Sequence, residues 1–164
     1  MTIHDFDMAR FLMGADVESV YAAGSVLVDP RIGAAGDLDT AMITLKFAGG
    51  ALGVIDNSRR AAYGYDQRVE VFGSNGAARA ENNFPNNVTL ADSTGVRQDL
   101  PYHFFMDRYI DAYVNELRAF VRCLHEQTPP PVSGEDGRQA ILIGLAARKS
   151  IAENRPVHLN EITG

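Results

Sequence analysis

The first residues of the chain place a histidine between aspartates, in Thr2-Ile3-His4-Asp5-Phe6-Asp7. In a helix, His4 and Asp7 share a face because they are three residues apart, whereas Asp5 points away. An imidazole that titrates near neutral pH can accept a hydroxyl proton, and a carboxylate can hold a neighbouring hydroxyl, which suits oxidation of a secondary alcohol. The spacing alone favours a plainer interpretation, in which the aspartates stabilise a helix amino terminus and His4 is a surface residue.

Two tyrosines flank a glycine in Tyr63-Gly64-Tyr65-Asp66. A phenol can stack on the C–H face of a ring and hydrogen-bond its hydroxyl groups, so these side chains also suit a polyol. Packing at a sheet edge beside a glycine turn is the alternative, and it carries more weight for Tyr63 than for Tyr65.

Hydrophobic periodicity predicts the elements that must position these residues. A short helix is expected first, with Thr2 as a cap and Gly14 as its end. Gly49-Gly50 and Asn75-Gly76 can supply the positive φ angles of tight hairpin turns, so the following strands should pair antiparallel in a meandering sheet. Seven β-rich runs are expected, at residues 17–28, 38–47, 51–58, 67–72, 77–81, 88–91 and 96–100.

Two long helices follow the strands, at about residues 105–126 and 135–154, and a last short strand is expected at 156–159. Most of the apolar stripe on the first of these helices is expected to lie in the core. Helices that flank a strand-rich middle indicate an α+β fold, with a mostly antiparallel, open-faced sheet and helices packed on one face. At 164 residues the chain is expected to form a single globular domain.

Composition and motifs disfavour several classes of function. The net charge of −6, without a cluster of Lys or Arg, disfavours nucleic acid as a partner. The lone Cys123 fits a reducing cytoplasm, and no run approaches the roughly 20 apolar residues of a membrane span. No histidine spacing indicates a metal site, and no serine lies in a Gly-x-Ser-x-Gly elbow, which disfavours a hydrolase.

Several motifs resemble the glucose-fructose oxidoreductase/inositol dehydrogenase (Gfo/Idh/MocA) family. Residues 2–12 are similar to its catalytic helix, and residues 62–76, with the Tyr-Gly-Tyr-Asp turn, are similar to the inositol 2-dehydrogenase branch. Residues 104–116 resemble its Arg-aromatic-x-x-Ala-Tyr-x-x-Glu helix, and residues 131–137 resemble the cap of its last helix. The resemblance implies a carboxy-terminal domain like that of dihydrodipicolinate reductase.

The resemblance also implies roles for individual residues. His4 would be the catalytic general base, Asp7 and Tyr65 would orient the polyol, and Arg108 and Tyr113 would line the substrate cleft. Hydride would pass from a small polyol such as myo-inositol to NAD or NADP. No residue of this chain is assigned to the cofactor or to a metal.

The resemblance covers only the carboxy-terminal half of the usual family chain. The Rossmann domain, a Glu-Lys-Pro motif and the Asp four residues before the His are not found in the sequence, and neither is a Gly-x-Gly-x-x-Gly between a strand and a helix. Residues 1–164 are therefore expected to form a substrate-binding and oligomerisation domain that is inactive alone.

The apolar alternation at residues 41–47 and 69–72 predicts homo-oligomerisation through the open sheet face. The alternative to a dehydrogenase domain is a module for assembly or ligand binding that performs no catalysis.

Overall fold

A computed structural model describes residues 2–162 of the chain. Contacts between Cα atoms divide them into two units. The first unit combines the described parts of Met1–Arg60 and Val132–Gly164, and the second unit is Ala61–Pro131.

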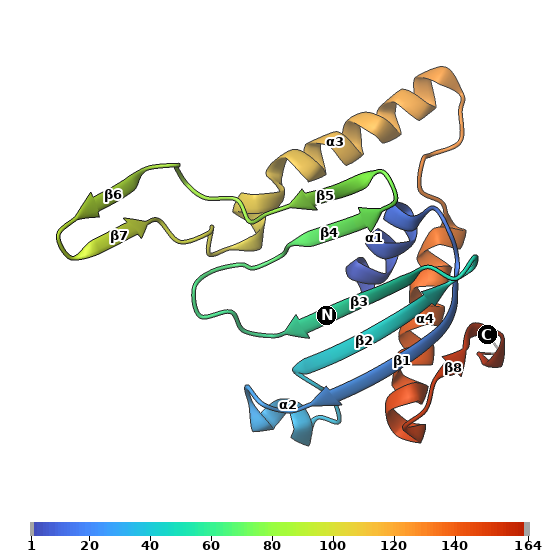
Figure 1. Cartoon of the computed structure of the whole chain (residues 1–164). Helices are drawn as coiled ribbons and strands as arrows, with labels where there is room; N and C mark the ends of the chain where they lie inside the picture. The colour runs from blue at the N-terminus through green and yellow to red at the C-terminus, as the bar shows by residue number, and fades with distance from the viewer. Residues whose placement is uncertain (1, 163–164) are drawn as a thin grey trace. The chain divides into compact units, whose positions relative to one another are not determined.

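A four-stranded antiparallel sheet, in the order β3-β2-β1-β8, forms the first unit (Figure 1). Gly49 and Gly50, at φ 86° and 90°, make the turn between β2 and β3, as the sequence predicts. The sheet comprises β1 (Val17–Ser25), β2 (Thr40–Phe47), β3 (Leu52–Ser58) and β8 (Val157–His158).

Helices α1 (Ile3–Met13) and α4 (Gly134–Glu153) cover one face of this sheet (Figure 1). Alternate residues of β2 point to that face and are buried, namely Ala41, Ile43, Leu45 and Phe47. They pack with residues from the helices and the neighbouring strands, including Phe6, Val20, Ile143, Ala146 and Val157. The expected α+β fold with helices on one sheet face is confirmed.

Local signals place most helix ends where the sequence predicts them. Gly14, at φ 58°, ends α1, and Ser133 and Asp136 form a reciprocal capping box at the start of α4. Thr2 occupies the N-cap position of α1, as expected, but its side chain makes no capping hydrogen bond. The run predicted as a strand to residue 28 ends at Ser25, and a short helix, α2 (Pro30–Ala34), follows, capped by Asp29.

A buried carboxylate closes the loop between β1 and β2. Asp39 is fully buried and accepts hydrogen bonds from the backbone N–H groups of Leu27, Val28 and Asp29, at 2.8, 2.8 and 2.9 Å. Thr40 donates a fourth, at 2.9 Å. Burial by itself would raise the pKa of Asp39, but these hydrogen bonds outweigh it and lower that pKa to about 2.

Two hairpins and a long helix make up the second unit. The hairpins are β4 (Val69–Gly73) with β5 (Gly76–Ala80), and β6 (Thr89–Asp92) with β7 (Gly95–Gln98). Each is a separate two-stranded sheet, so the expectation of one continuous meander was wrong. Helix α3 (Phe105–Glu126) has the bounds that its periodicity predicts.

The apolar stripe of α3 is not buried, which corrects the expectation that most of it is core. Its large apolar side chains keep between 38% and 66% of their surface exposed, among them Ile110, Leu117, Phe120 and Leu124. Helical periodicity therefore identified an amphipathic helix but not a buried one.

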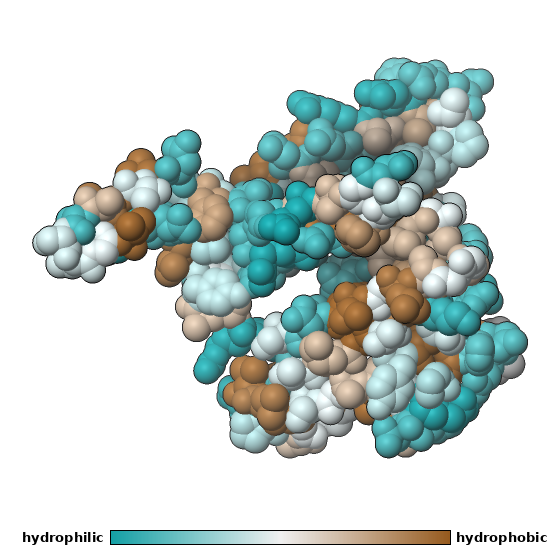
Figure 2. All heavy atoms as spheres, in the orientation of Figure 1, coloured by the Kyte–Doolittle hydropathy of each residue, from teal (hydrophilic) through white to brown (hydrophobic). Residues whose placement is uncertain are grey.

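The sheet face opposite α1 and α4, here called the outer face, carries apolar side chains of its own. Tyr21, Thr44 and Val54 form one row across β1, β2 and β3, and Val54 is 70% exposed. Figure 2 shows apolar side chains over β2 and β3 on this face. The alternation at 41–47, from which an apolar outer face was predicted, belongs instead to the buried face.

Candidate functional site

Helix α1 presents His4 and Asp7 on the same side. One residue advances about 100° around an α-helix, so both lie on the half turned away from Phe6, together with Phe11. Phe6 is 3% exposed and packs in the core, whereas Phe11 is 79% exposed and His4 is exposed as well. Asp7 is half-buried. The side-by-side placement expected from the spacing is therefore present.

On the side of α1 opposite His4 and Asp7, contacts hold the helix against the rest of the first unit. The Phe6 ring lies over Gly144 of α4, where an added Cβ would be 3.7 Å from Cε2 of Phe6. Asn57 of β3 donates from Nδ2 to Oδ2 of Asp5 at 3.3 Å, next to His4. A core aromatic and a polar contact thus fix the first turn of the helix.

The Tyr63-Gly64-Tyr65-Asp66 turn depends on its glycine. Gly64 is buried at φ 138°, and a Cβ on it would lie 2.8 Å from the carbonyl oxygen of Pro101. The Tyr65 N–H donates to the carbonyl of Tyr102 at 2.8 Å. The turn can approach this backbone only because residue 64 lacks a side chain.

Asp66 is the centre of a polar network beside that turn. Its carboxylate accepts from Arg68 at 2.8 Å and from Asn82 at 2.6 Å, and also from the hydroxyl of Tyr63. Hydrogen bonds from Arg68 first, and then from Tyr63 and Asn82, lower the pKa of Asp66 to about 2 against the effect of burial. The bond to Asp66 raises the pKa of Tyr63, so this phenol stays a neutral donor.

These residues line a hollow of about 390 Å³ together with Phe84 and Asp99. Amide, carboxylate, guanidinium and phenol groups around an aromatic ring are groups that bind hydroxyl-rich ligands. Asp66, Arg68 and Asn82 were not among the residues selected from the sequence. The sequence could have indicated Asp66, because it ends the Tyr-Gly-Tyr-Asp motif. No sequence motif indicates Asn82.

Tyr65 belongs to an aromatic cluster with α3. Its ring meets that of Tyr109 edge-on, with centroids 5.9 Å apart, and that of Phe105 at 6.4 Å. Burial, and then the neighbouring Tyr65, raise the pKa of Tyr109 to about 12. Tyr109 was expected only as a packing residue of the helix.

Arg108 contacts the same cluster and the strands beside it. Its guanidinium carbon lies 5.7 Å from the centroid of the Tyr109 ring, and Nη2 donates to the carbonyl of Gln67 at 2.8 Å. A longer bond of 3.4 Å reaches the carbonyl of Glu81. Nη1 is buried and makes no hydrogen bond within the described residues.

The predicted site residues thus fall into two groups. His4 and Asp7 share one side of α1 in the first unit, and Tyr65 and Arg108 meet around Tyr109 in the second. Tyr113 lies one turn further along α3 and is 44% exposed. The catalytic and substrate-binding roles of all five residues stay predictions.

Within residues 2–162, no three His, Cys, Asp or Glu side chains are grouped so that they could hold a metal ion. The helices of this part of the chain include none with the length and apolar character of a membrane span.

Sequence and structure comparisons define the class of protein to which this arrangement belongs. Residues 1–159 match the family described as "Oxidoreductase family, C-terminal alpha/beta domain". The chain therefore belongs to the Gfo/Idh/MocA oxidoreductase family and corresponds to its carboxy-terminal domain.

Within this family, the chain is similar to inositol dehydrogenases. The chain is 57% identical, over its whole length, to 49% of the myo-inositol 2-dehydrogenase of Thermotoga maritima. A crystal structure of a probable dehydrogenase from the same organism superposes on 99% of the chain and 49% of that protein, with a TM-score of 0.97 and 56% identity.

A structure of scyllo-inositol dehydrogenase from Lactobacillus casei, with bound NAD(H) and scyllo-inositol, superposes on 98% of the chain and 47% of that protein. Its TM-score is 0.88 and its identity 27%. The chain spans about half the length of the curated relatives it matches.

Proposed function

We propose that this chain is the substrate-binding part of an oxidoreductase that oxidises a ring secondary alcohol of an inositol or a similar cyclitol. The observation that carries the proposal is the pairing of His4 and Asp7 on the side of α1 opposite its core contacts. The similarity to inositol dehydrogenases supports a cyclitol as the substrate class.

His4 is the proton acceptor in this proposal. The free ring nitrogen of a neutral imidazole can take the hydroxyl proton as the carbon gives up hydride. Asp7, on the same side of the helix, accepts a hydrogen bond from a second hydroxyl of the ring. A cyclitol carries hydroxyls on adjacent carbons, so one side of a helix can contact two of them.

Tyr65 contributes a phenol whose ring is held by Tyr109 and Phe105. Fixing the ring lowers the entropy lost when its hydroxyl binds a ligand. We assign Tyr65 to orienting the polyol. Arg108, which contacts the Tyr109 ring, and Tyr113 are also assigned to the substrate cleft.

The described residues do not fit a dinucleotide site. Every strand pair within residues 2–162 is antiparallel, whereas dinucleotide pyrophosphates bind at the strand–turn–helix of a parallel βαβ unit. No residue of this chain is therefore assigned to NAD or NADP.

The test is inositol oxidation by the protein isolated at its native length, followed as reduction of NAD or NADP with myo-inositol. We expect His4→Gln to lower kcat by about 10²- to 10⁴-fold, because a general base contributes about this much. His125→Gln, in the last turn of α3, is the matched control and should leave kcat unchanged. Equal activity of the two variants would contradict the assignment of His4.

We also expect the 164-residue chain alone to be inactive in this assay, because residues 2–162 form no parallel βαβ unit that could bind a dinucleotide. Reduction of NAD by this chain with myo-inositol would contradict that expectation.

A second candidate function is self-association through the outer face, which the exposure of Leu52 and Val54, both 70%, favours. Burying these side chains against a second copy would remove apolar surface from water. We expect Val54→Glu to shift the sedimentation of the chain toward the monomer, whereas Val96→Glu, on an equally exposed strand residue of β7, should not. A monomeric parent chain would exclude this candidate.

A further inference from the structure

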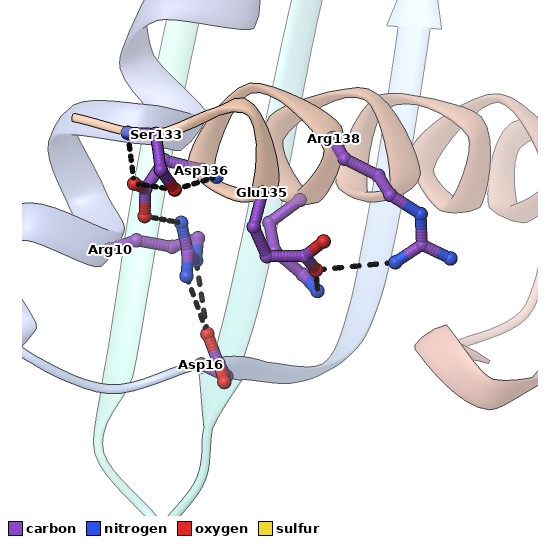
Figure 3. A network of polar contacts seen from close by, with 7 residues as sticks. Arg10, Asp16, Ser133, Glu135, Asp136 and Arg138 are labelled. Carbon is purple, nitrogen blue, oxygen red and sulfur yellow. Dashed lines mark hydrogen bonds and ion pairs between the residues drawn. The ribbon is translucent and has the colours of Figure 1, made fainter. Parts of the chain in front are cut away.

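Arg10 links three segments of the first unit. From α1 its Nε and Nη2 donate to Oδ1 of Asp16 at 3.1 and 2.8 Å, and its Nη1 donates to Oδ1 of Asp136 at 3.3 Å (Figure 3). Asp16 precedes β1, and Asp136 lies in the first turn of α4. The Arg10 side chain is only 15% exposed, so this guanidinium is held among its partners rather than in solvent.

The two oxygens of Asp136 have different partners. Oδ2 accepts from the backbone N–H and from the hydroxyl of Ser133, both at 2.8 Å, which completes the cap of α4. Oδ1 accepts from Arg10. The carboxylate that begins α4 is thus the one that receives the side chain from α1, and Figure 3 shows Arg10 pointing between it and Asp16.

The position of Arg10 on the helix gives this link a geometric effect. Arg10 lies about 40° from Phe6 around the helix axis, and Asp7 about 60° further round. Phe6 and Arg10 therefore attach α1 to the rest of the first unit at two points that differ in their angle around the helix axis. Two such points, one in the core and one in the last turns, resist rotation of the helix about its axis. Phe6 alone would act as a pivot.

We propose that Arg10 is a positioning residue, which fixes the rotation of α1 and thereby the direction in which His4 and Asp7 point. This inference rests on the proposed function, in which those two side chains contact the substrate. A planar guanidinium can serve two carboxylates at once, which the ammonium of lysine does less well. The hydrogen bonds and charges of Asp16 and Asp136 outweigh burial, which alone would lower the pKa of Arg10, and keep it charged.

A rotation of the helix is costly for catalysis because a misplacement of about 1 Å can lower a rate on the order of 100-fold. In the native-length protein we expect Arg10→Met to lower kcat for myo-inositol by about 10- to 100-fold, on the same basis. Arg10→Lys should have an intermediate kcat, because lysine keeps the positive charge but lacks the planar guanidinium that binds both carboxylates.

Arg155→Met is the matched control, because it tests whether a loss of stability alone lowers kcat. Among the described residues, Arg155 forms ion pairs with Glu153 and Glu161 in the same unit, and none with α1. We expect it to lower the thermal midpoint as Arg10→Met does, while kcat stays within about twofold. Asp16→Asn, which removes one exposed partner of Arg10, provides a milder variant if Arg10→Met does not fold.

A second readout does not depend on turnover. In the NMR spectrum of the 164-residue chain, Arg10→Met should shift the imidazole resonances of His4, and Arg155→Met should leave them in place. Unmoved His4 resonances, or equal losses of kcat in the two variants, would overturn the proposal. An inactive parent protein would instead refute the proposed function, and the His4 resonances would still decide the role of Arg10.

Discussion

Two phenylalanines, on hairpins that follow one another along the chain, show how differently the two units are held together. Phe47 of β2 is completely buried beneath the helices of the first unit, whereas Phe72 of β4 is 85% exposed. The described strands and helix of the second unit contain no buried residue. Its local order comes from polar groups and tight turns, such as Asp66 and Gly64, and from the ring contacts of Tyr65. Full apolar burial stabilises one unit, whereas polar bonds, tight turns and partly exposed ring contacts stabilise the other.

The largest difference between the two units should appear when each of these phenylalanines is replaced by alanine. We expect Phe47→Ala to lower the free energy of unfolding by about 3–5 kcal/mol, because it leaves a cavity in the core. Phe72→Ala should change it by no more than about 0.5 kcal/mol, as for other exposed positions. Chemical denaturation of both variants measures this. A large loss in Phe72→Ala would mean that another surface covers β4 in solution.

The role of tight turns in the second unit can be tested at two glycines. Gly64 and Gly76 have similar φ angles, 138° and 142°, but only Gly64 lacks room for a Cβ. We expect Gly76→Ala to cost about 1–3 kcal/mol through backbone strain, and Gly64→Ala to cost more because it also meets the Pro101 carbonyl.

Hydrogen exchange at the Tyr65 amide should report this difference, since its bond to Tyr102 depends on the Gly64 turn. Equal protection of that amide in both alanine variants would show that the close approach contributes nothing.

The smallest effect concerns a polar group within the apolar unit. The folded pKa of Asp39, about 2, lies below its usual 3.8. Its stabilising contribution is therefore present above about pH 4 and is lost as the pH falls through about 2. We expect the thermal midpoint of Asp39→Asn to fall less between pH 4 and pH 2 than that of the parent chain. Parallel pH curves would contradict the role of this carboxylate.

Elements defined by local signals could be predicted from the sequence. The Gly49-Gly50 turn, Gly14 after α1 and the Ser133–Asp136 box are each encoded within a few residues. Burial of the α3 stripe could not be predicted in this way, because periodicity identifies an apolar face without its partner. Helix α2 was missed although Asp29-Pro30 is a start signal, since the apolar run before it dominated.

For the candidate site, short spacings were equally informative. A spacing of three positions from His4 to Asp7 was enough to place them on one side of a helix. The bond from Arg108 to the Gln67 carbonyl joins residues 41 positions apart, and Asn82 reaches Asp66 across 16. Such contacts depend on tertiary structure, which spacing does not encode.

The interleaving of the two units has a consequence for synthesis of the chain. Strands β1 to β3 emerge from the ribosome long before α4, which covers the buried face of β2. At about 5–20 residues per second, the stretch between β3 and α4 takes roughly 4–15 s to translate. During that time Ile43, Leu45 and Phe47 have no α4 to cover them. The nascent protein is therefore most open to chaperone capture, or to aggregation, in the interval before α4 is made.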